Sequence, residues 1–534
     1  MKFLPMQNME EEMTYDYIVI GSGFGGSVAA LRLAEKGYTV CVIESGKRWQ
    51  AKDFPKTNWK FWKFLWAPAL FCYGIQRIQP LNDVLILGGS GVGGGSLVYA
   101  NTLFVPPDAF FNDIQWKGLV SDWKVELMPF YEIAKKMLGV VTNPKFWPTD
   151  YMLQDYAREI GRESYFKPSE VGVFFGEAGV TVPDPYFGGK GPARTGCTMT
   201  GHCMVGCRDG GKNSLDRNYL YLAEQLGVEI IPERKVIDVK PDGAGEYVIT
   251  SQKVTDFIFK KKNVRRARGV VIAAGVIGTL ELLMRCKEKD SLPDLSDKLG
   301  HIVRTNSEVL AGVTSRKNQQ HSLGVSITSS VFVNDNTHIE LVRYPKGSDV
   351  MATFAGLMTD GGSKIPRPLK FLWNSIRHPI QSLRIRIPIS WGRNSVILLV
   401  MQTLDNYLTV SRKQRWWTLF KKGLVSKNKG KKIPTYIPEA NQALRGMAQR
   451  MDAIPQNALT EVLFNIPMTA HILGGCIMGK DKEHGVINKY HQVFGYENMY
   501  VVDASAIPAN LGVNPSLTIT AMAERAMSLI PPKM

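Results

Sequence analysis

A glycine-rich turn between two short apolar runs restricts the start of this chain to very few folds. It lies in YDYIVIGSGFGGSVAALRLAEKGYTVCVIESG, residues 15–46. The apolar run 17–20 predicts a strand, residues 27–36 predict a helix, and the run 40–43 predicts a second strand that ends at Glu44. A strand, a glycine turn, a helix and a second strand in this order are the first unit of a Rossmann-like α/β fold.

Each glycine of the turn is required for a different steric reason. Gly21 permits a tight turn, Gly23 lets the backbone approach a pyrophosphate, and Gly26 lets the helix pack close to the strand. The helix N-terminus offers free N–H groups and partial positive charge to phosphates. Glu44 can accept hydrogen bonds from a ribose diol, and its charge repels a 2′-phosphate. The motif therefore predicts a bound dinucleotide, FAD or NAD, at Gly21, Ser22, Gly23, Gly26 and Glu44.

A second glycine run, VLILGGSGVGGGSLVYANTLFVPP, repeats the spacing at Gly89, Gly91 and Gly94. The residues after it are aromatic, β-branched and interrupted by proline, which disfavours a helix. We expect an irregular loop whose backbone lies close to a ligand, where side chains would clash. We find no complete second dinucleotide motif elsewhere. A flavin enzyme that used NAD(P)H would need one, so a substrate is expected to meet the flavin directly.

The composition is that of a globular protein with a strongly basic balance. A chain of 534 residues suggests two or more domains, and 65 Lys and Arg against 48 Asp and Glu give a net charge of +17. Such a charge has three possible explanations: binding to nucleic acid, binding to an anionic membrane surface, or a basic surface without a dedicated partner. No nucleic-acid-binding motif accompanies it, so no nucleic-acid partner is expected.

Three of the seven cysteines lie together in TGCTMTGHCMVGCRDGGKNS, at Cys197, Cys203 and Cys207. A cysteine at position 200 would give the spacing of a bacterial ferredoxin, but this residue is Thr. A closed zinc site needs four ligands, and His202 lies too close to Cys203 in sequence to pair well with it, which leaves three. We expect structural thiols and no metal, with a metal site and a local disulfide as the alternatives. The scattered cysteines, with no visible secretory signal or membrane-spanning run, predict a cytoplasmic protein that is at most peripheral to a membrane.

The C-terminal region carries the most specific motifs of the chain. They are HILGGCIMG at 471–479, YVVDASAIPANLGVNP at 500–515 and TITAMAER at 518–525. Together with the N-terminal glycine motif and GVGGGS, they resemble the glucose–methanol–choline (GMC) family of FAD oxidoreductases. Within that family the chain is similar to the bacterial cholesterol oxidase branch, which holds FAD non-covalently. The middle of the chain also fits, in VVIAAGVIGTLELL at 270–283 and THIELVRYPKGS at 337–348.

The resemblance implies an α/β fold, α+β overall, with a Rossmann-like FAD-binding domain assembled from separated segments. That domain would comprise residues 13–104, 205–305 and 470–534. A substrate-binding domain, residues 105–204 and 306–469, would be inserted between them and built on a mixed β-sheet. The strand-like runs VEIIPERKVIDVKP and GVVIAAG agree with an extended nucleotide-binding sheet.

The resemblance also assigns roles to single residues. His471 matches the active-site histidine that faces the flavin, Asn514 the asparagine that pairs with it, and Glu340 the catalytic glutamate of the cholesterol oxidases. Alone, each has a plainer interpretation: a packed core histidine, a turn asparagine before proline, and an exposed strand glutamate. The positions expected to contact FAD are Gly95, Tyr99, Ala100, Thr102, Val236, Asp503, Ala504 and Ser516.

Several of these positions depart from the family pattern. Tyr99, Ala100 and Thr102 stand where cholesterol oxidases have Asn, Gly and Met, and Ser516 replaces an aromatic residue. We therefore expect the substrate pocket and the tuning of the flavin to differ, while the cofactor stays the same.

The implied activity is oxidation of a secondary alcohol to a ketone by hydride transfer to the flavin, on a sterol or similarly bulky apolar substrate. Electrons would pass on to O₂ or another acceptor. His471 or Glu340 would take the hydroxyl proton, and Glu340 could also move the C4 proton of a Δ5 sterol to C6. Two alternatives stay open: a GMC enzyme for long-chain or other apolar alcohols, and a sterol- or lipid-binding flavoprotein without turnover.

Two further segments suit transient contact with a membrane surface. Residues 58–78 are dense in aromatic side chains, and residues 411–432 are basic and carry Trp416 and Trp417. The resemblance places the first segment near the lid over the substrate cavity, so the two together could receive a lipid. The alternative is a packed core segment and a solvated hairpin.

Overall fold

The N-terminal glycine motif forms the strand–helix–strand unit that the sequence predicts. In the computed structural model, which describes residues 14–256, 260–414 and 422–534, β1 (Thr14–Ile20) leads into α1 (Phe24–Glu35) and β2 (Val40–Ile43). β1 and β2 pair in parallel. The helix begins at Phe24 rather than Ser27, so Gly23 directly precedes its first turn.

β1 and β2 belong to a large sheet with the strand order β12-β2-β1-β15-β14-β13, in which β27 also pairs with β15. β12, β2, β1, β15 and β27 run parallel, and β14 and β13 continue the sheet in the antiparallel sense. The other members of this sheet are β12 (Glu229–Ile231), β13 (Arg234–Pro241), β14 (Tyr247–Lys253), β15 (Lys262–Ile272) and β27 (Met499–Val501).

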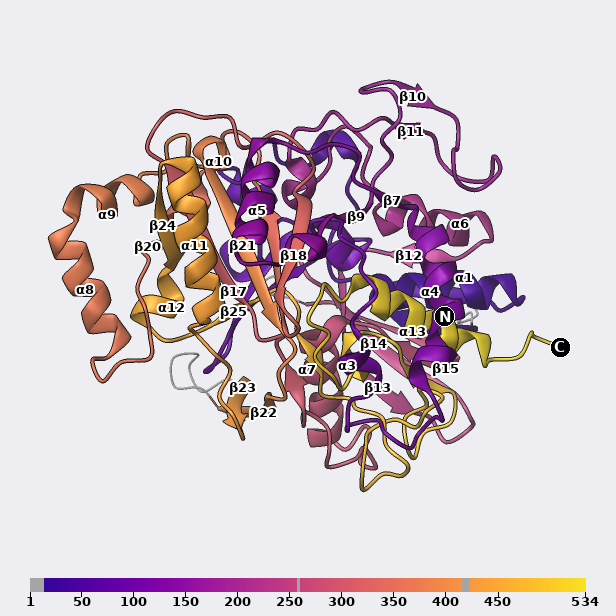
Figure 1. Ribbon diagram of the computed structural model, residues 1–534. Coiled ribbons are helices and arrows are strands. Elements are labelled where there is room, and N and C mark those ends of the chain that lie inside the picture. Colours follow the sequence, from indigo (N-terminus) through magenta and orange to yellow (C-terminus); the bar gives the residue numbers. More distant parts are fainter. Residues whose placement is uncertain (1–13, 257–259, 415–421) are drawn as a thin grey trace, which may run out of the picture.

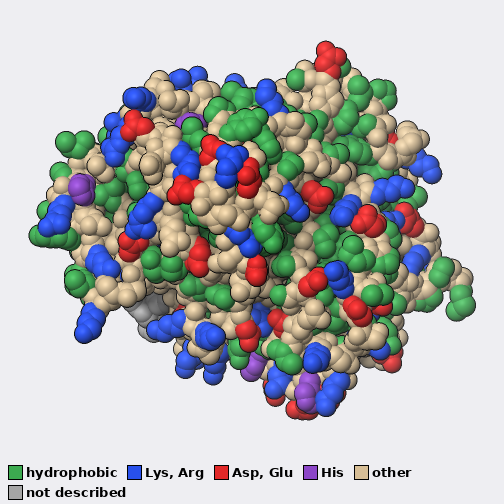
Figure 2. Space-filling view, viewed as in Figure 1, with side chains coloured by type: hydrophobic (Ala, Val, Ile, Leu, Met, Phe, Trp, Pro, Cys, Tyr) green, Lys and Arg blue, Asp and Glu red, His purple; other side chains and the backbone are tan. Residues whose placement is uncertain are grey.

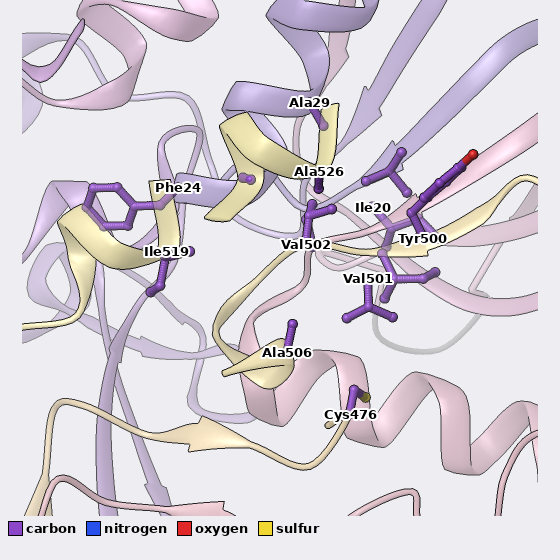
Figure 3. Close-up of a cluster of buried hydrophobic side chains, with 14 of the residues drawn as sticks. Ile20, Phe24, Ala29, Cys476, Tyr500, Val501, Val502, Ala506, Ile519 and Ala526 are labelled. Atoms are coloured by element: carbon purple, nitrogen blue, oxygen red, sulfur yellow. The ribbon is translucent and has the colours of Figure 1, made fainter. Parts of the chain in front are cut away.

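Apolar residues of this sheet and of its helices form one buried cluster, which brings the two ends of the chain together (Figure 3). Ile20 of β1 and Val501 of β27 lie in it, beside residues of α1 and of α13 (Ser516–Ser528). α1 packs against α13 and α6 (Tyr219–Gln225), α13 packs against α4 (Trp123–Leu138), and α7 (Gly275–Glu288) packs against β13.

A second large sheet has the strand order β20-β24-β17-β21-β19-β18-β8 (Figure 1). Its strands are β8 (Phe166–Pro168), β17 (Val309–Ser315), β18 (Ile327–Asn334), β19 (Thr337–Val342), β20 (Ala355–Leu357), β21 (Ser395–Gln402) and β24 (Ala453–Ala458). Helices α5 (Pro148–Glu159) and α11 (Pro438–Met451) cover one face of this sheet and share a buried cluster with Ile339 and Leu341. Because side chains alternate along a strand, His338, Glu340 and Val342 point to the other face.

Two smaller sheets lie beside the large ones. One has the order β23-β22-β16-β26, from β16 (Val303–Arg304), β22 (Tyr407–Gln414), β23 (Lys422–Lys429) and β26 (Leu473–Gly474). The other has the order β25-β6-β5-β3-β4, from β3 (Leu65–Ala67), β4 (Cys72–Tyr73), β5 (Gln76–Pro80), β6 (Leu85–Gly89) and β25 (Met468–Thr469). None of the helices in the described part of the chain is long and apolar enough to cross a membrane.

The second glycine run follows β6 and does not open an α-helix, which agrees with the irregular loop that the sequence predicts. Gly91, Gly93 and Gly94 have φ values of +135°, +105° and +53°, which glycine adopts far more readily than other residues. The loop then makes a single 3₁₀ turn, Gly94–Leu97, and its backbone comes close to the N-terminal motif: a Cβ on Gly94 would lie 2.7 Å from the Cα of Gly23.

We propose the two-domain division expected from the sequence for the folded chain as well. Strands of the first large sheet fall within 13–104, 205–305 and 470–534, and strands of the second fall within 105–204 and 306–469. Helix α4 crosses this division, because its buried residues belong to the hydrophobic cluster of the first sheet.

Gly26→Ala should lower the free energy of unfolding, because a Cβ at this position would lie 2.0 Å from the carbonyl oxygen of Gly21 and push α1 away from the turn. We expect a loss of about 1–3 kcal/mol, the usual cost of overpacking, in denaturant unfolding of the ligand-free protein. Gly23→Ala is the matched control, since its Cβ would meet nothing within 4 Å. An equal loss in both variants would contradict this account of the turn.

Candidate active site

A cavity of about 530 Å³ opens at the glycine turn, in front of the N-terminus of α1. No side chain caps this N-terminus, so its N–H groups are available to a ligand that accepts hydrogen bonds. The open space beside Gly23 is wide enough for a ligand to lie against the backbone. The cavity is lined by five of the residues predicted to hold the cofactor, Gly21, Gly23, Glu44, Gly95 and Val236.

A second helix also begins at this cavity. Ala274 and Gly275, at the start of α7, line it, and the predicted cofactor residue Asp503 holds this helix from behind. The Asp503 carboxylate accepts hydrogen bonds from the Gly275 N–H at 2.9 Å, the Thr279 hydroxyl at 2.5 Å and the Ser505 N–H at 2.8 Å. Two helices thus begin at the lining of one cavity, which suits the phosphates of a dinucleotide.

Glu44 and Ser22 are linked at the rim of the cavity. The N–H and hydroxyl of Ser22 donate to Glu44 Oε2 at 3.1 and 2.8 Å, and the Gly46 N–H donates to Oε1 at 2.8 Å. The Ser45 hydroxyl also donates to Oε1, at 3.2 Å, so Glu44 already accepts about the four hydrogen bonds that a carboxylate can take. A ribose hydroxyl would therefore replace one of these donors. Four cationic residues that the sequence did not single out also line the cavity, Arg77, Arg234, Lys235 and Lys260.

The remaining predicted cofactor residues lie beside the cavity rather than in its lining. Gly26 packs behind the turn, and the Tyr99 hydroxyl donates to the carbonyl of Asn213 at 3.4 Å while its ring contacts Phe24 edge-on. Thr102 is buried and pairs with Val171, and Ala100 packs against the face of the second sheet that carries Glu340. Ala504 follows Asp503, and Ser516 is the first residue of α13.

The structure brings together the three residues predicted to be catalytic, although they are distant in sequence. Glu340 comes from β19, His471 from the loop between β25 and β26, and Asn514 from the loop before α13. The Asn514 Nδ2 donates to Glu340 Oε2 at 3.2 Å and lies 3.4 Å from His471 Nε2. All three side chains are buried, so the alternative of an exposed strand glutamate at 340 is wrong.

A fourth residue, Glu308, completes this group, and the sequence analysis missed it. Its Oε2 lies 2.6 Å from His471 Nδ1, and its Oε1 accepts hydrogen bonds from the backbone N–H groups of Ala470 and His471. Glu308 belongs to the polar run RTNSE at 304–308, which is buried in the structure. A polar run of this kind is typical of an exposed loop, and no signal in the sequence distinguishes a buried polar run from an exposed one.

Burial and neighbouring charges shift the pKa values of this group. Burial raises the pKa of Glu340 to about 8, although His471 and the hydrogen bond from Asn514 oppose the shift. Burial alone lowers the pKa of His471, but the carboxylates of Glu308 and Glu340 outweigh it, and the net pKa is raised. The site therefore holds titratable groups that can exchange a proton near neutral pH.

Unpaired polar atoms mark the space that these residues face. Asn514 Oδ1, Glu340 Oε1 and His338 Nδ1 are buried and have no hydrogen-bond partner in the part of the chain that the structure describes. His338 Nδ1 lies 3.9 Å from Glu340 Oε1, and burial lowers the pKa of His338 to about 3, so its ring stays neutral. Buried polar atoms are nearly always satisfied, so these indicate the place of a polar ligand atom such as a hydroxyl.

The three clustered cysteines, Cys197, Cys203 and Cys207, are free thiols. Burial raises the pKa values of Cys197, to about 12, and of Cys203, which disfavours metal-binding thiolates. His202 contacts the Thr200 hydroxyl at 2.9 Å and the Lys56 carbonyl at 3.2 Å through its two ring nitrogens. Within the described residues, no group of three or more His, Cys, Asp and Glu could hold a metal ion.

Comparisons with known proteins agree with this site. Models of the GMC oxidoreductase family match residues 193–299 and 425–523, and a model of an FAD binding domain matches residues 16–52. A cholesterol oxidase of Mycobacterium tuberculosis is 49% identical over 97% of this chain and 91% of that protein. A cholesterol oxidase of Acinetobacter baumannii is 45% identical over 97% of this chain and 95% of that protein.

A solved structure supports the fold alone. The pyridoxine 4-oxidase from Mesorbium loti superposes with a TM-score of 0.58 at 14% identity, over 96% of this chain and 98% of that one. The family models and the near full-length relatives carry the assignment further. The chain therefore belongs to the GMC oxidoreductase family, in the branch that holds these cholesterol oxidases, and is an FAD-dependent alcohol oxidoreductase.

Proposed function

We propose that this chain oxidises the 3β-hydroxyl of a sterol, or of a similarly bulky apolar alcohol, to a ketone. The observation that carries the proposal is the buried group of His471, Asn514 and Glu340, in a chain 49% identical to a cholesterol oxidase. Beside Glu340, the same face of the second sheet is apolar, with a buried cluster of Ile327, Val342, Leu399 and Met401. A bulky apolar substrate suits this wall, since burying its surface drives binding.

His471 is the proposed base for the hydroxyl proton. The contact of Nδ1 with Glu308 holds the ring in one orientation and favours a proton on Nδ1, which leaves Nε2 as the acceptor. Asn514 would orient the substrate alcohol: its Nδ2 lies between His471 Nε2 and Glu340 Oε2, and its Oδ1, which has no partner among the described residues, is free to face the hydroxyl. When bound, FAD supplies the acceptor for the hydride that leaves the carbinol carbon.

Glu340 is the proposed proton carrier for isomerisation of a Δ5 ketone. A carboxylate whose pKa is raised to about 8 is a stronger base than an ordinary one, and after taking the C4 proton it can return it at C6. His338 remains neutral beside it and does not compete for the proton. The raised pKa also means that Glu340 is ionised only in a minor fraction at neutral pH.

The flavin is proposed to be non-covalent, to be reduced by the substrate and to be reoxidised by O₂ or another acceptor. Anaerobic mixing with cholesterol should bleach the flavin band, and denaturation should release the flavin from the protein. His471→Ala should slow bleaching by roughly 10²–10⁴-fold, the usual contribution of a positioned base, without loss of FAD. Readmitting oxygen then shows whether the reduced flavin reacts with it.

Three results of the bleaching experiment would contradict the proposed sterol oxidation or the role of His471. Bleaching by a long-chain alcohol and not by cholesterol would change the substrate class. No bleaching by any alcohol would favour a lipid-binding flavoprotein. An unchanged rate in His471→Ala would remove that residue from the proposed chemistry.

Glu340→Gln should stop isomerisation while oxidation continues, so the unconjugated Δ5-3-ketone should accumulate. In the unmodified protein, isomerisation should rise as the pH increases through about 8, because Glu340 is protonated below its raised pKa and ionised above it. Ultraviolet absorbance measures both the product of Glu340→Gln and the pH dependence of isomerisation, because only the conjugated ketone absorbs strongly at longer wavelength. A conjugated product at the normal rate from Glu340→Gln would exclude this role.

Glu308→Gln should move the pH profile of oxidation and lower its plateau. The Glu308 carboxylate raises the pKa of His471, and His471 must be neutral to accept a proton. Removing that charge lowers the pKa of His471, so the rise of kcat with pH should begin at lower pH. The plateau should fall by roughly 10- to 100-fold, part of the base's whole contribution, because the ring is held less firmly.

Glu461→Gln is the matched control for this experiment. Glu461 is also fully buried, and burial raises its pKa to about 8, so it carries little charge at neutral pH. Its Oε1 accepts a hydrogen bond from the Leu310 N–H at 3.2 Å. We expect its substitution to leave the pH profile in place, and an equal shift in both variants would show that Glu308 has no specific part in orienting His471.

A further inference from the structure

Helices α8 (Arg367–Arg377) and α9 (Pro379–Arg386) stand at the outer edge of the second sheet, beside its edge strand β20 (Figure 1). Their inner side chains hold them to the rest of the molecule: Arg367 donates to the Thr359 carbonyl, Lys370 to the Asp360 carbonyl and Arg386 to the Ala355 carbonyl. Phe371 packs beside Gly356 of β20, and Ile385 shares a small buried cluster with Ala355, Leu357 and Ile454. These contacts fix the inner side of the helix pair and leave its outer side uncovered.

The outer side of the helix pair and its flanks is apolar. Ile376 is 72% exposed, Ile380 81% and Leu383 63%. In α8 the exposed apolar residues follow the three- or four-residue spacing of one helix face, and α9 adds Ile380 and Leu383. The exposed set, here called the α8–α9 face, is Ile365, Leu369, Leu372, Trp373, Ile376, Ile380, Leu383, Ile387 and Ile389. Scattered exposed apolar residues are ordinary, but nine of them gathered on two neighbouring helices and their flanks indicate an interaction surface.

The same segment is strongly cationic. The sequence between Asp360 and Asp405 contains no acidic residue and seven Lys and Arg. Lys364, Arg377 and Arg384 are exposed, and within the described residues none of them forms an ion pair with a carboxylate. Figure 2 shows hydrophobic and basic side chains intermixed along the edge of the molecule that carries these helices.

Two partners could cover the α8–α9 face: a second copy of the chain or an anionic lipid bilayer. The combination of positive charge and apolar surface favours the bilayer. A second copy of the chain would bring two uncompensated cationic surfaces together, because the segment has no acidic partner to offer. An anionic lipid bilayer accepts both features, since its headgroups attract Lys and Arg while apolar side chains enter the acyl boundary. Arg377 lies over the ring of Trp373, 4.7 Å from its centroid, an arrangement that suits the membrane–water interface.

We propose that the α8–α9 face docks the enzyme on an anionic membrane surface, with the two helices lying in the plane of the headgroups. The inference rests on this surface and not on the proposed substrate, although a membrane is also where an apolar alcohol would be found. The α8–α9 face is separate from residues 58–78 and 411–432, the two segments for which the sequence suggested membrane contact. Trp416 and Trp417 lie outside the described residues. In the aromatic segment 58–78, residues 66–69 line the cavity at the glycine turn, whereas Trp59, Phe61 and Trp62 are about half exposed.

The test is flotation of the holoenzyme with vesicles that contain no sterol. The unmodified protein should float with vesicles of equal parts phosphatidylcholine and phosphatidylglycerol, and less so at high salt or with phosphatidylcholine alone. The combined variant Trp373→Ser, Ile376→Ser and Ile380→Ser should lose at least about tenfold in vesicle affinity, because it removes the apolar anchors. All three side chains are exposed, so the fold should be unaffected.

The matched control is Ile114→Ser, Val125→Ser and Leu226→Ser, three apolar residues exposed elsewhere on the surface. It should float as the unmodified protein does, and both variants should oxidise a detergent-dispersed alcohol at the unmodified rate. The proposal is overturned if the unmodified protein does not float, if the control loses equal affinity, or if the triple variant only abolishes self-association in light scattering. Because flotation uses no substrate, failure of the proposed function would leave its result unchanged.

Discussion

Burial of the polar run at 304–308 is the constraint on which the arrangement of the active site depends. The Arg304 Nε donates to the Pro508 carbonyl at 2.5 Å, and Asn306 both donates to the Val513 carbonyl at 2.9 Å and accepts from the Gly512 N–H at 2.7 Å. Glu308 holds the loop that carries His471. A buried polar group without a partner costs about 1–3 kcal/mol, so each of these groups fixes its partner loop in place. The loops of His471 and Asn514 are thus positioned by one segment.

That segment leads directly into β17, and the second sheet places Glu340, the carboxyl proposed for isomerisation. β17 pairs with β21, and β21 pairs with β19, which carries Glu340. The alternation of side chains sends Ile339 and Leu341 into the core beneath α11 and sends Glu340 toward Asn514. A shift of the strand by one residue would bury Glu340 under the helix instead, so the hydrophobic packing of the sheet also sets the geometry of the site.

The sequence predicted the parts of this arrangement that depend on local spacing. The strand–helix–strand unit, the irregular second glycine loop and the cavity lined by Gly21, Gly23 and Glu44 all follow from glycine positions and apolar runs. The resemblance supplied His471, Asn514 and Glu340, whose roles stay predictions although the structure brings them together. Glu308 could not be found this way, because its proposed role rests on a contact across 163 residues and its neighbours in sequence look like a solvated turn.

The edge and the centre of the second sheet connect the proposed docking surface with the site. From β20, which α8 and α9 cover, the order runs through β24, β17 and β21 to β19, and strands in a sheet are about 4.8 Å apart. Glu340 is therefore roughly 19 Å from the edge strand across a continuous hydrogen-bonded sheet. Such a sheet is a rigid connection, so an enzyme held by its α8–α9 face would present its active site at a fixed height and tilt to the bilayer. On this proposal, the unpaired cations and apolar residues of the α8–α9 face set the position of the active site relative to the bilayer. The buried polar run at 304–308 sets the geometry within the site.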